Sequence, residues 1–137
     1  MIKLMNMLMI LLASSFSQFA YACGDKDVVG KWIGNLSPGQ NSGYLFNENY
    51  QFTILHNGKP MGLGENGYKA NWVVDCSHTP AHLTMTMTDK HGRSTALKAI
   101  FMKLTDDHLV IRHGYEGVRP SSFNNQANNQ TEFRQVK

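Results

Sequence analysis

The chain lacks a strong charge of either sign. Its 137 residues include 13 lysines and arginines against 10 aspartates and glutamates, a formal net charge of +3 at neutral pH. The basic residues are scattered along the chain and form no run. Nucleic-acid binding needs a concentrated positive surface that neutralises phosphates. The sequence therefore gives no electrostatic case for a nucleic-acid partner, and none is expected.

A long hydrophobic run is missing as well. The most apolar stretch, residues 4–13, is well short of the roughly 20 residues that a membrane-spanning helix needs. Lys3 precedes this stretch, and Ala20-Tyr21-Ala22 follows it with small residues at the two positions that signal peptidase recognises. We therefore predict a cleaved signal peptide over residues 1–22. The mature domain, residues 23–137, is then exported to the periplasm or secreted.

Cysteine is scarce, with Cys23 and Cys76 alone. An even count in an exported protein predicts one disulfide, which would close a loop of about 50 residues and contribute roughly 3–4 kcal/mol. Cleavage after residue 22 would also make Cys23 the first residue, as in bacterial lipoproteins. The lipoprotein signal prefers an aliphatic residue three positions before the cysteine, where Ala20 stands here. The two alternatives exclude each other, so a membrane contact is expected only if Cys23 is lipidated.

Helical periodicity is absent, because no stretch of ten or more residues repeats its apolar positions every 3.6 residues. Glycine, asparagine and aspartate instead separate short runs of β-branched and aromatic residues, which indicates strands and turns. In the run 83–88, Leu83, Met85 and Met87 share one face and three threonines share the other. Asn57-Gly58 is typical of a two-residue hairpin turn.

These patterns predict an all-β domain, either an up-and-down antiparallel barrel of about eight strands or a small sandwich. A closed barrel is favoured because it leaves no strand edge exposed, which suits a monomer. Loops are expected at residues 35–41, 62–67 and 120–130. The expected strands cover residues 28–33, 44–46, 50–55, 68–75, 83–88, 95–104, 108–113 and 131–136.

Four motifs follow one another as they do in a family of small bacterial lipocalin-like domains. That family has a G-x-W strand start, a G-x-Y-x-x-D strand, a Pro-x-x-hydrophobic strand start and an R-P-x-x-F loop. The matching residues here are Gly30-Lys31-Trp32, Tyr68-Lys69 with Asp75, Thr79-Pro80-Ala81-His82-Leu83, and Arg119-Pro120-Ser121-Ser122-Phe123. The chain resembles this family over residues 28–134, which implies an eight-stranded lipocalin-like barrel with an interior cavity. The two cysteines and the glycine-rich run 62–67 depart from the family pattern.

The resemblance also implies structural roles for four residues. In lipocalins the tryptophan of G-x-W closes the barrel floor, and an arginine of the last strand lies on its ring. Trp32 and Arg134 are the corresponding residues here, joined by a cation–π contact worth roughly 1–2 kcal/mol. Gly30 would allow a close backbone approach at that corner, and Arg119, before Pro120, would belong to a stiffened loop that enters the last strand.

Sets of residues that carry chemistry are also missing. None of the 6 histidines has a carboxylate or cysteine at zinc-site spacing. Met85 and Met87 offer sulfurs that suit Cu(I), but their alternation with threonine favours a core role. The run 62–67 has the letters of the phosphate-binding motif G-x-G-x-x-G, but it lacks the preceding strand and the following helix that this motif requires. The G-x-S-x-G motif of a serine nucleophile is not present. We therefore expect no metal, no cofactor and no enzymatic activity.

Two functions remain from these exclusions. The first is a binding module that holds a small hydrophobic or amphipathic molecule in the barrel. The alternative is an exported interaction or inhibitor module that contacts an envelope protein through the loops 35–41 or 62–67. The residues expected to line the ligand site of the first are Phe52, Ile54, Trp72, Leu83, Met85, Leu97 and Ile111.

Overall fold

The computed structural model describes residues 23–37, 40–61 and 68–137, and these fold into one antiparallel nine-stranded sheet. A short 3-10 helix, η1 (Asp25–Asp27), precedes the sheet. The predicted signal peptide and the glycine-rich run 62–67 lie outside the described residues. The all-β class predicted from the sequence is confirmed. The strands are β1 (Gly30–Ser37), β2 (Gln40–Phe46), β3 (Phe52–His56), β4 (Lys59–Pro60), β5 (Lys69–Asp75), β6 (Ala81–Thr88), β7 (Ser94–Thr105), β8 (His108–His113) and β9 (Gln130–Val136).

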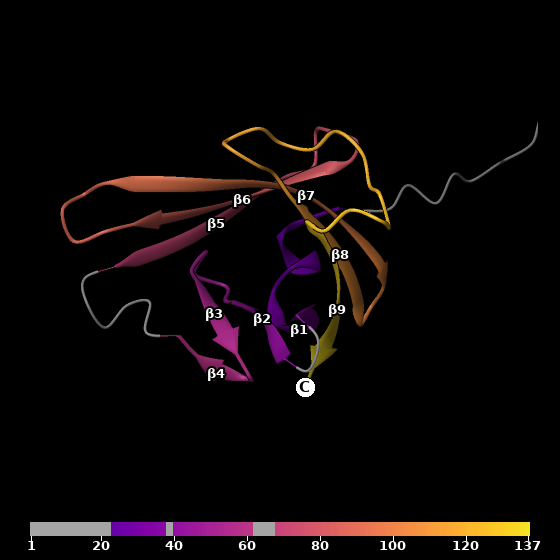
Figure 1. Ribbon diagram of the computed structural model, residues 1–137, viewed down its shortest axis with the longest axis horizontal. Coiled ribbons are helices and arrows are strands. Elements are labelled where there is room, and N and C mark those ends of the chain that lie inside the picture. The colour runs from indigo at the N-terminus through magenta and orange to yellow at the C-terminus, as the bar shows by residue number, and fades with distance from the viewer. Residues whose placement is uncertain (1–22, 38–39, 62–67) are drawn as a thin grey trace, which may run out of the picture.

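The strands follow an up-and-down order that curls into a barrel-like shape (Figure 1). Their order in the sheet is β4-β3-β2-β1-β9-β8-β7-β6-β5, so the last strand pairs with the first. Among the described residues, β3 and β5 meet at a narrow seam rather than along a full ladder. The seam consists of a bridge between Gln51 and Asn71 and a 2.9 Å hydrogen bond from the Trp72 amide to the Tyr50 carbonyl. The sheet is therefore a curled half-barrel, consistent with the predicted barrel-like fold, and its two ends meet only at this seam among the described residues.

Period-two alternation builds the core, as predicted. On β6, Leu83 and Met85 are buried, while Thr84 and Thr86, which alternate with them, are half-buried. The inner face of the sheet, defined here as the face that carries these residues, holds one continuous cluster. Burying each large apolar side chain there contributes about 1.5–3 kcal/mol. The large members of the cluster are Val28, Trp32, Tyr44, Phe46, Phe52, Trp72, Leu83, Met85, Phe101, Leu109, Ile111 and Phe133.

The hairpins explain where the strand boundaries lie. Asn57 and Gly58 both have positive φ, 51° and 75°, as the predicted two-residue turn between β3 and β4 requires. The loop predicted over residues 35–41 is too long, because residues 35–37 belong to β1 and residues 40–41 belong to β2. Ladder pairing continues past a register shift between Gly34 and Ser37, and pairing overrides the weak strand propensity of these residues.

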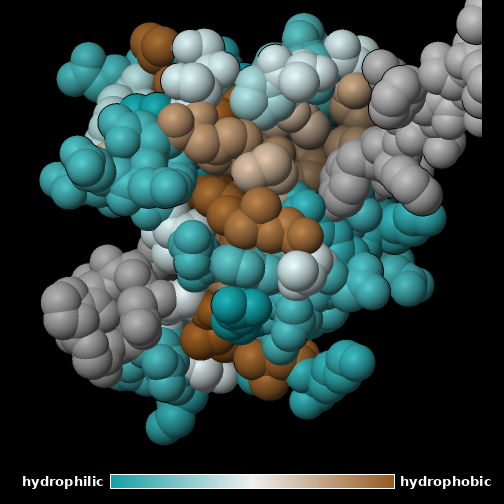
Figure 2. Space-filling view, turned by 90° about the vertical axis from the view of Figure 1, so that its right-hand side faces the viewer, coloured by the Kyte–Doolittle hydropathy of each residue, from teal (hydrophilic) through white to brown (hydrophobic). Residues whose placement is uncertain are grey.

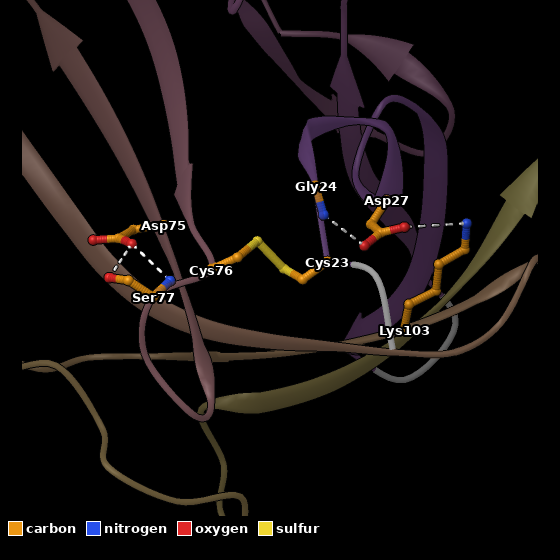
Figure 3. The surroundings of a disulfide bond; sticks show 7 residues. All are labelled: Cys23, Gly24, Asp27, Asp75, Cys76, Ser77 and Lys103. Atoms are coloured by element: carbon orange, nitrogen blue, oxygen red, sulfur yellow. Dashed lines mark hydrogen bonds and ion pairs between the residues drawn. A yellow bond between two sulfur atoms is a disulfide. The ribbon is translucent and has the colours of Figure 1, made fainter. Parts of the chain in front are cut away.

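The predicted disulfide joins Cys23 to Cys76, with their Cα atoms 5.7 Å apart. It fixes the segment before β1 against the end of β5 (Figure 3). In that segment Val28 is fully buried, and its carbonyl accepts a 2.8 Å hydrogen bond from the Trp32 indole. The N-terminal segment and Trp32 therefore close this end of the barrel together.

Arg134 does not contact Trp32, contrary to the role that the resemblance implies. The β1–β9 register places Arg134 opposite Ile33 and Gln135 opposite Trp32, and opposite residues share a face of the sheet. Arg134 therefore lies on the outer face, with 65% of its side chain exposed and 3.9 Å from Asp107.

Gln135, rather than Arg134, is the residue of β9 that lies opposite Trp32. A Cβ added to Gly30, whose φ is 134°, would lie 2.5 Å from the Gln135 side-chain nitrogen. Glycine is favoured at the first residue of β1 by its backbone conformation, whereas the end of the flexible Gln135 side chain could move away from an added Cβ.

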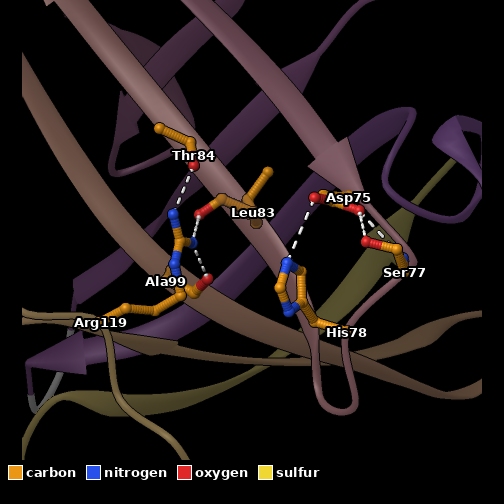
Figure 4. A network of polar contacts seen from close by, with 7 residues as sticks. All are labelled: Asp75, Ser77, His78, Leu83, Thr84, Ala99 and Arg119. Carbon is orange, nitrogen blue, oxygen red and sulfur yellow. Dashed lines mark hydrogen bonds and ion pairs between the residues drawn. The ribbon is translucent and has the colours of Figure 1, made fainter.

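Arg119 binds the long connection between β8 and β9 to the outer face of the sheet. Its guanidinium donates to the Leu83 carbonyl at 3.1 Å, the Ala99 carbonyl at 2.6 Å and the Thr84 hydroxyl at 2.8 Å (Figure 4). Ile100, next to Ala99 and on the opposite face from the core, is fully buried. The connection thus covers a second, smaller apolar area, and Arg119 links it to β6 and β7 at once.

Candidate functional site

The residues predicted to bind a ligand come together in the barrel interior. Phe52, Trp72, Leu83, Met85 and Ile111 are each at most 4% exposed and belong to the core cluster. Ile54 and Leu97 are half-buried and pack against it. Small barrels are commonly filled by their own side chains. A ligand role for these seven residues stays a prediction, and their placement shows a packed core.

A separate apolar pocket of about 550 Å³ lies at the end of the barrel, beside the disulfide. Figure 2 faces this end of the molecule and shows hydrophobic side chains gathered in a central band, bordered by hydrophilic ones. The volume falls within the range of about 300–1,000 Å³ that is usual for small-molecule sites. The apolar wall consists of Pro80, Ala81, Phe101, Met102 and Phe123.

The pocket exists because β7 extends beyond its neighbour β6. Ala81, the first residue of β6, pairs with Phe101 of β7. Within the described residues, β7 then continues to Thr105 with β8 as its partner. The space beside residues 102–105 is bounded by the turn 77–80 and by the disulfide. The hollow is thus a consequence of unequal strand lengths.

Lys103 and His78 are the ionisable groups of this pocket. Lys103 pairs with the buried Leu109 in the β7–β8 ladder and therefore lies on the inner face. Its side chain is only 17% exposed, and its Nζ is 3.9 Å from Asp27 Oδ1. The other carboxylate oxygen of Asp27 accepts the Gly24 amide at 3.0 Å. Figure 3 shows the ammonium reaching Asp27 close to the disulfide.

His78, which lines the pocket on the side of the turn, stacks on His82. The rings of His78 and His82 are parallel, with centroids 3.9 Å apart, and His78 Nε2 is 3.5 Å from Asp75 (Figure 4). Hydrogen bonds from Ser77 lower the pKa of Asp75. Burial, followed by the charges of Arg119 and His78, lowers the pKa of His82. The neutral imidazole of His82 is therefore favoured.

A second polar pair lies inside the barrel and was missed from the sequence. Tyr44 Oη is 2.9 Å from His113 Nε2. Burial raises the pKa of Tyr44 to about 12 and lowers the pKa of His113. Both groups are therefore neutral, and each satisfies the other in the aromatic core. The signal in the sequence was the position of His113, which alternates with Leu109 and Ile111 on one strand face.

Neither a metal centre nor a membrane helix is found in the described ranges. No three or more histidine, cysteine, aspartate or glutamate side chains within 23–37, 40–61 and 68–137 are placed to hold a metal ion. The described part of the chain also has no helix with the length and hydrophobicity needed to cross a membrane. No family model, curated protein or solved structure matches the chain.

Proposed function

We propose that the protein is an exported, lipocalin-like barrel that binds a small hydrophobic or amphipathic molecule and does not catalyse a reaction. The binding site is the pocket beside the disulfide rather than the packed interior. The observation that carries this proposal is an apolar hollow of about 550 Å³ that has an ammonium and an imidazole among its lining groups. Such a lining suits a ligand with an apolar body and a polar end.

The pocket is also held in shape before any ligand arrives. Its walls come from four separate parts of the chain: the N-terminal segment, the turn before β6, the end of β7 and the β8–β9 connection. The disulfide links the first two parts, and Arg119 attaches the connection to β6 and β7. A preformed site loses less conformational entropy on binding.

A pocket-filling variant tests the proposal. The neutral probe N-phenyl-1-naphthylamine is titrated into the protein, and saturable fluorescence enhancement is expected. Ala81→Trp places a large ring in the pocket and should remove most of this signal. Ala96→Trp, on an exposed part of β7, is the matched control and should keep it. Absence of saturable binding by the unaltered protein, or full binding by a folded Ala81→Trp variant, would refute the proposal.

The alternative, an exported module that binds an envelope protein, is favoured by the seam at β5. β5, which carries the 57% exposed Val73, is an end strand of the sheet and pairs towards β3 through the Gln51–Asn71 bridge alone among the described residues. Such an edge can pair with a strand of another protein. Cross-linking in the envelope distinguishes the two functions. A partner that is lost with Val73→Lys but retained with Ala81→Trp would support this alternative.

A further inference from the structure

We infer that the pocket selects an amphiphile whose polar end is a carboxylate, and that Lys103 receives this end. The inference rests on the proposed function and names the chemical class of its ligand. Two observations carry it. An apolar wall leads to Lys103, which lines the pocket from β7, and the ammonium of this lysine lies 3.9 Å from Asp27 Oδ1, beyond hydrogen-bonding distance.

The position of Lys103 follows from the alternation of β7. Ala99 and Phe101 precede it on the inner face, and both are buried. Lys103 is the next inward residue, so its aliphatic stem continues the apolar wall while its ammonium lies beside Asp27. A ligand chain lying along Phe101 would therefore bring its end group to the lysine.

The ammonium of Lys103 forms a long ion pair with Asp27. An ammonium has three N–H donors, yet Lys103 Nζ makes no hydrogen bond to any residue in the described ranges. Its 3.9 Å separation from Asp27 Oδ1 is an ion pair beyond hydrogen-bonding distance. Because Lys103 lines the pocket, its N–H donors are available to a ligand that supplies acceptor oxygens, and charge-assisted hydrogen bonds to these oxygens add affinity.

Charge selects among the possible end groups. A cationic head would be repelled by Lys103, and a head with two negative charges would exceed what one ammonium can neutralise. Asp27 opposes any anion, because it shares the same lysine. Asp75, which does not line the pocket, accepts hydrogen bonds from Ser77, and the Arg119 guanidinium is occupied by β6 and β7. A single carboxylate, which accepts charge-assisted hydrogen bonds, fits these charges best.

Competition among amphiphiles of equal chain length tests the inference. Dodecanoate, dodecanol and dodecyltrimethylammonium displace bound N-phenyl-1-naphthylamine, each kept below its critical micelle concentration. We expect dodecanoate to bind about tenfold more tightly than dodecanol, which corresponds to roughly 1.4 kcal/mol, and the cation to bind most weakly. Lys103→Met, which keeps the apolar stem, should abolish the preference for dodecanoate, so that dodecanoate and dodecanol bind with equal affinity.

Two further variants separate the charge from packing. Asp27→Asn keeps an oxygen for the Gly24 amide and removes the competing charge, so dodecanoate should bind several-fold more tightly. Lys98→Met, at an exposed position of β7, should change nothing. Equal affinities of dodecanoate and dodecanol for the unaltered protein would overturn the inference and leave the proposed function intact. Loss of both ligands in a folded Lys103→Met variant would also overturn it. Failure of the unaltered protein to bind the probe would instead refute the proposed function.

Discussion

Removal of the Arg119 side chain should destabilise the whole domain, although the residue lies in a connection between strands. Its guanidinium makes three hydrogen bonds, to the carbonyls of Leu83 and Ala99 and to the hydroxyl of Thr84. These acceptors belong to two neighbouring strands. Arg119→Ala therefore detaches the β8–β9 connection from both strands and exposes Ile100, which is otherwise fully buried.

The magnitude follows from the kind of bonds that are lost. A hydrogen bond to a charged group contributes about 1.5–3 kcal/mol. The three bonds share one side chain that is only partly buried, so their contributions do not add in full. We expect a loss of about 2–4 kcal/mol in the free energy of unfolding. Arg119→Lys should recover little of it, because a single ammonium cannot reach three acceptors as a planar guanidinium does.

Urea unfolding followed by tryptophan fluorescence measures this loss. Trp32 and Trp72 are both 1% exposed, so unfolding changes their environment. Arg93→Ala is the control, because the Arg93 side chain is 79% exposed and pairs with a neighbouring aspartate in the same turn. The control should leave the unfolding midpoint nearly unchanged. An Arg119→Ala variant as stable as the control would show that the three hydrogen bonds of Arg119 do not stabilise the domain.

Two further predictions concern the disulfide and the buried histidine. Reduction of the Cys23–Cys76 bond, whose partners are 53 residues apart, should lower the free energy of unfolding by roughly 4 kcal/mol; unfolding midpoints that coincide with and without reductant would contradict this. Because burial lowers the pKa of His113 below its value of about 6.5 in the unfolded chain, the unfolded state binds more protons as the pH falls below that value. Stability should therefore be complete above about pH 6.5 and decline below it. Urea midpoints across this range should decline less steeply in His113→Gln, and an unchanged slope would exclude His113 as the cause.

Much of the fold could be predicted from the sequence because it depends on local alternation. The alternation of Leu83 and Met85 predicted which face of β6 is buried, and Asn57-Gly58 predicted the turn of a hairpin. The two-residue strand β4 has no pattern of its own, since it exists only as the partner of β3. Arg134 was misplaced because one residue of register decides which face a side chain occupies, and register is a property of two strands together.

The pocket could not be predicted for a related reason. Alternation identifies which side chains point inward, but not whether they leave a cavity between them. The aromatic rings on the inner face fill the space that a ligand would need: Tyr44 alone lies within 5.5–6.3 Å of the rings of Phe46, Phe52 and Phe133, measured between centroids. A hollow forms instead where the lengths of adjacent strands differ, and strand length depends on pairing as much as on residue type.

One residue in the sequence does mark the place where the packed interior ends. On β7 the inward positions run from Ala99 and Phe101, both buried, to Lys103. A lysine in line with core residues is costly unless the wall of the barrel opens there or a counter-charge meets it. Both conditions hold here, since β6 begins opposite Phe101 and Asp27 lies beside the ammonium. A charged residue that interrupts an inward-facing series thus locates the end of the core, and here the apolar pocket lies at that end.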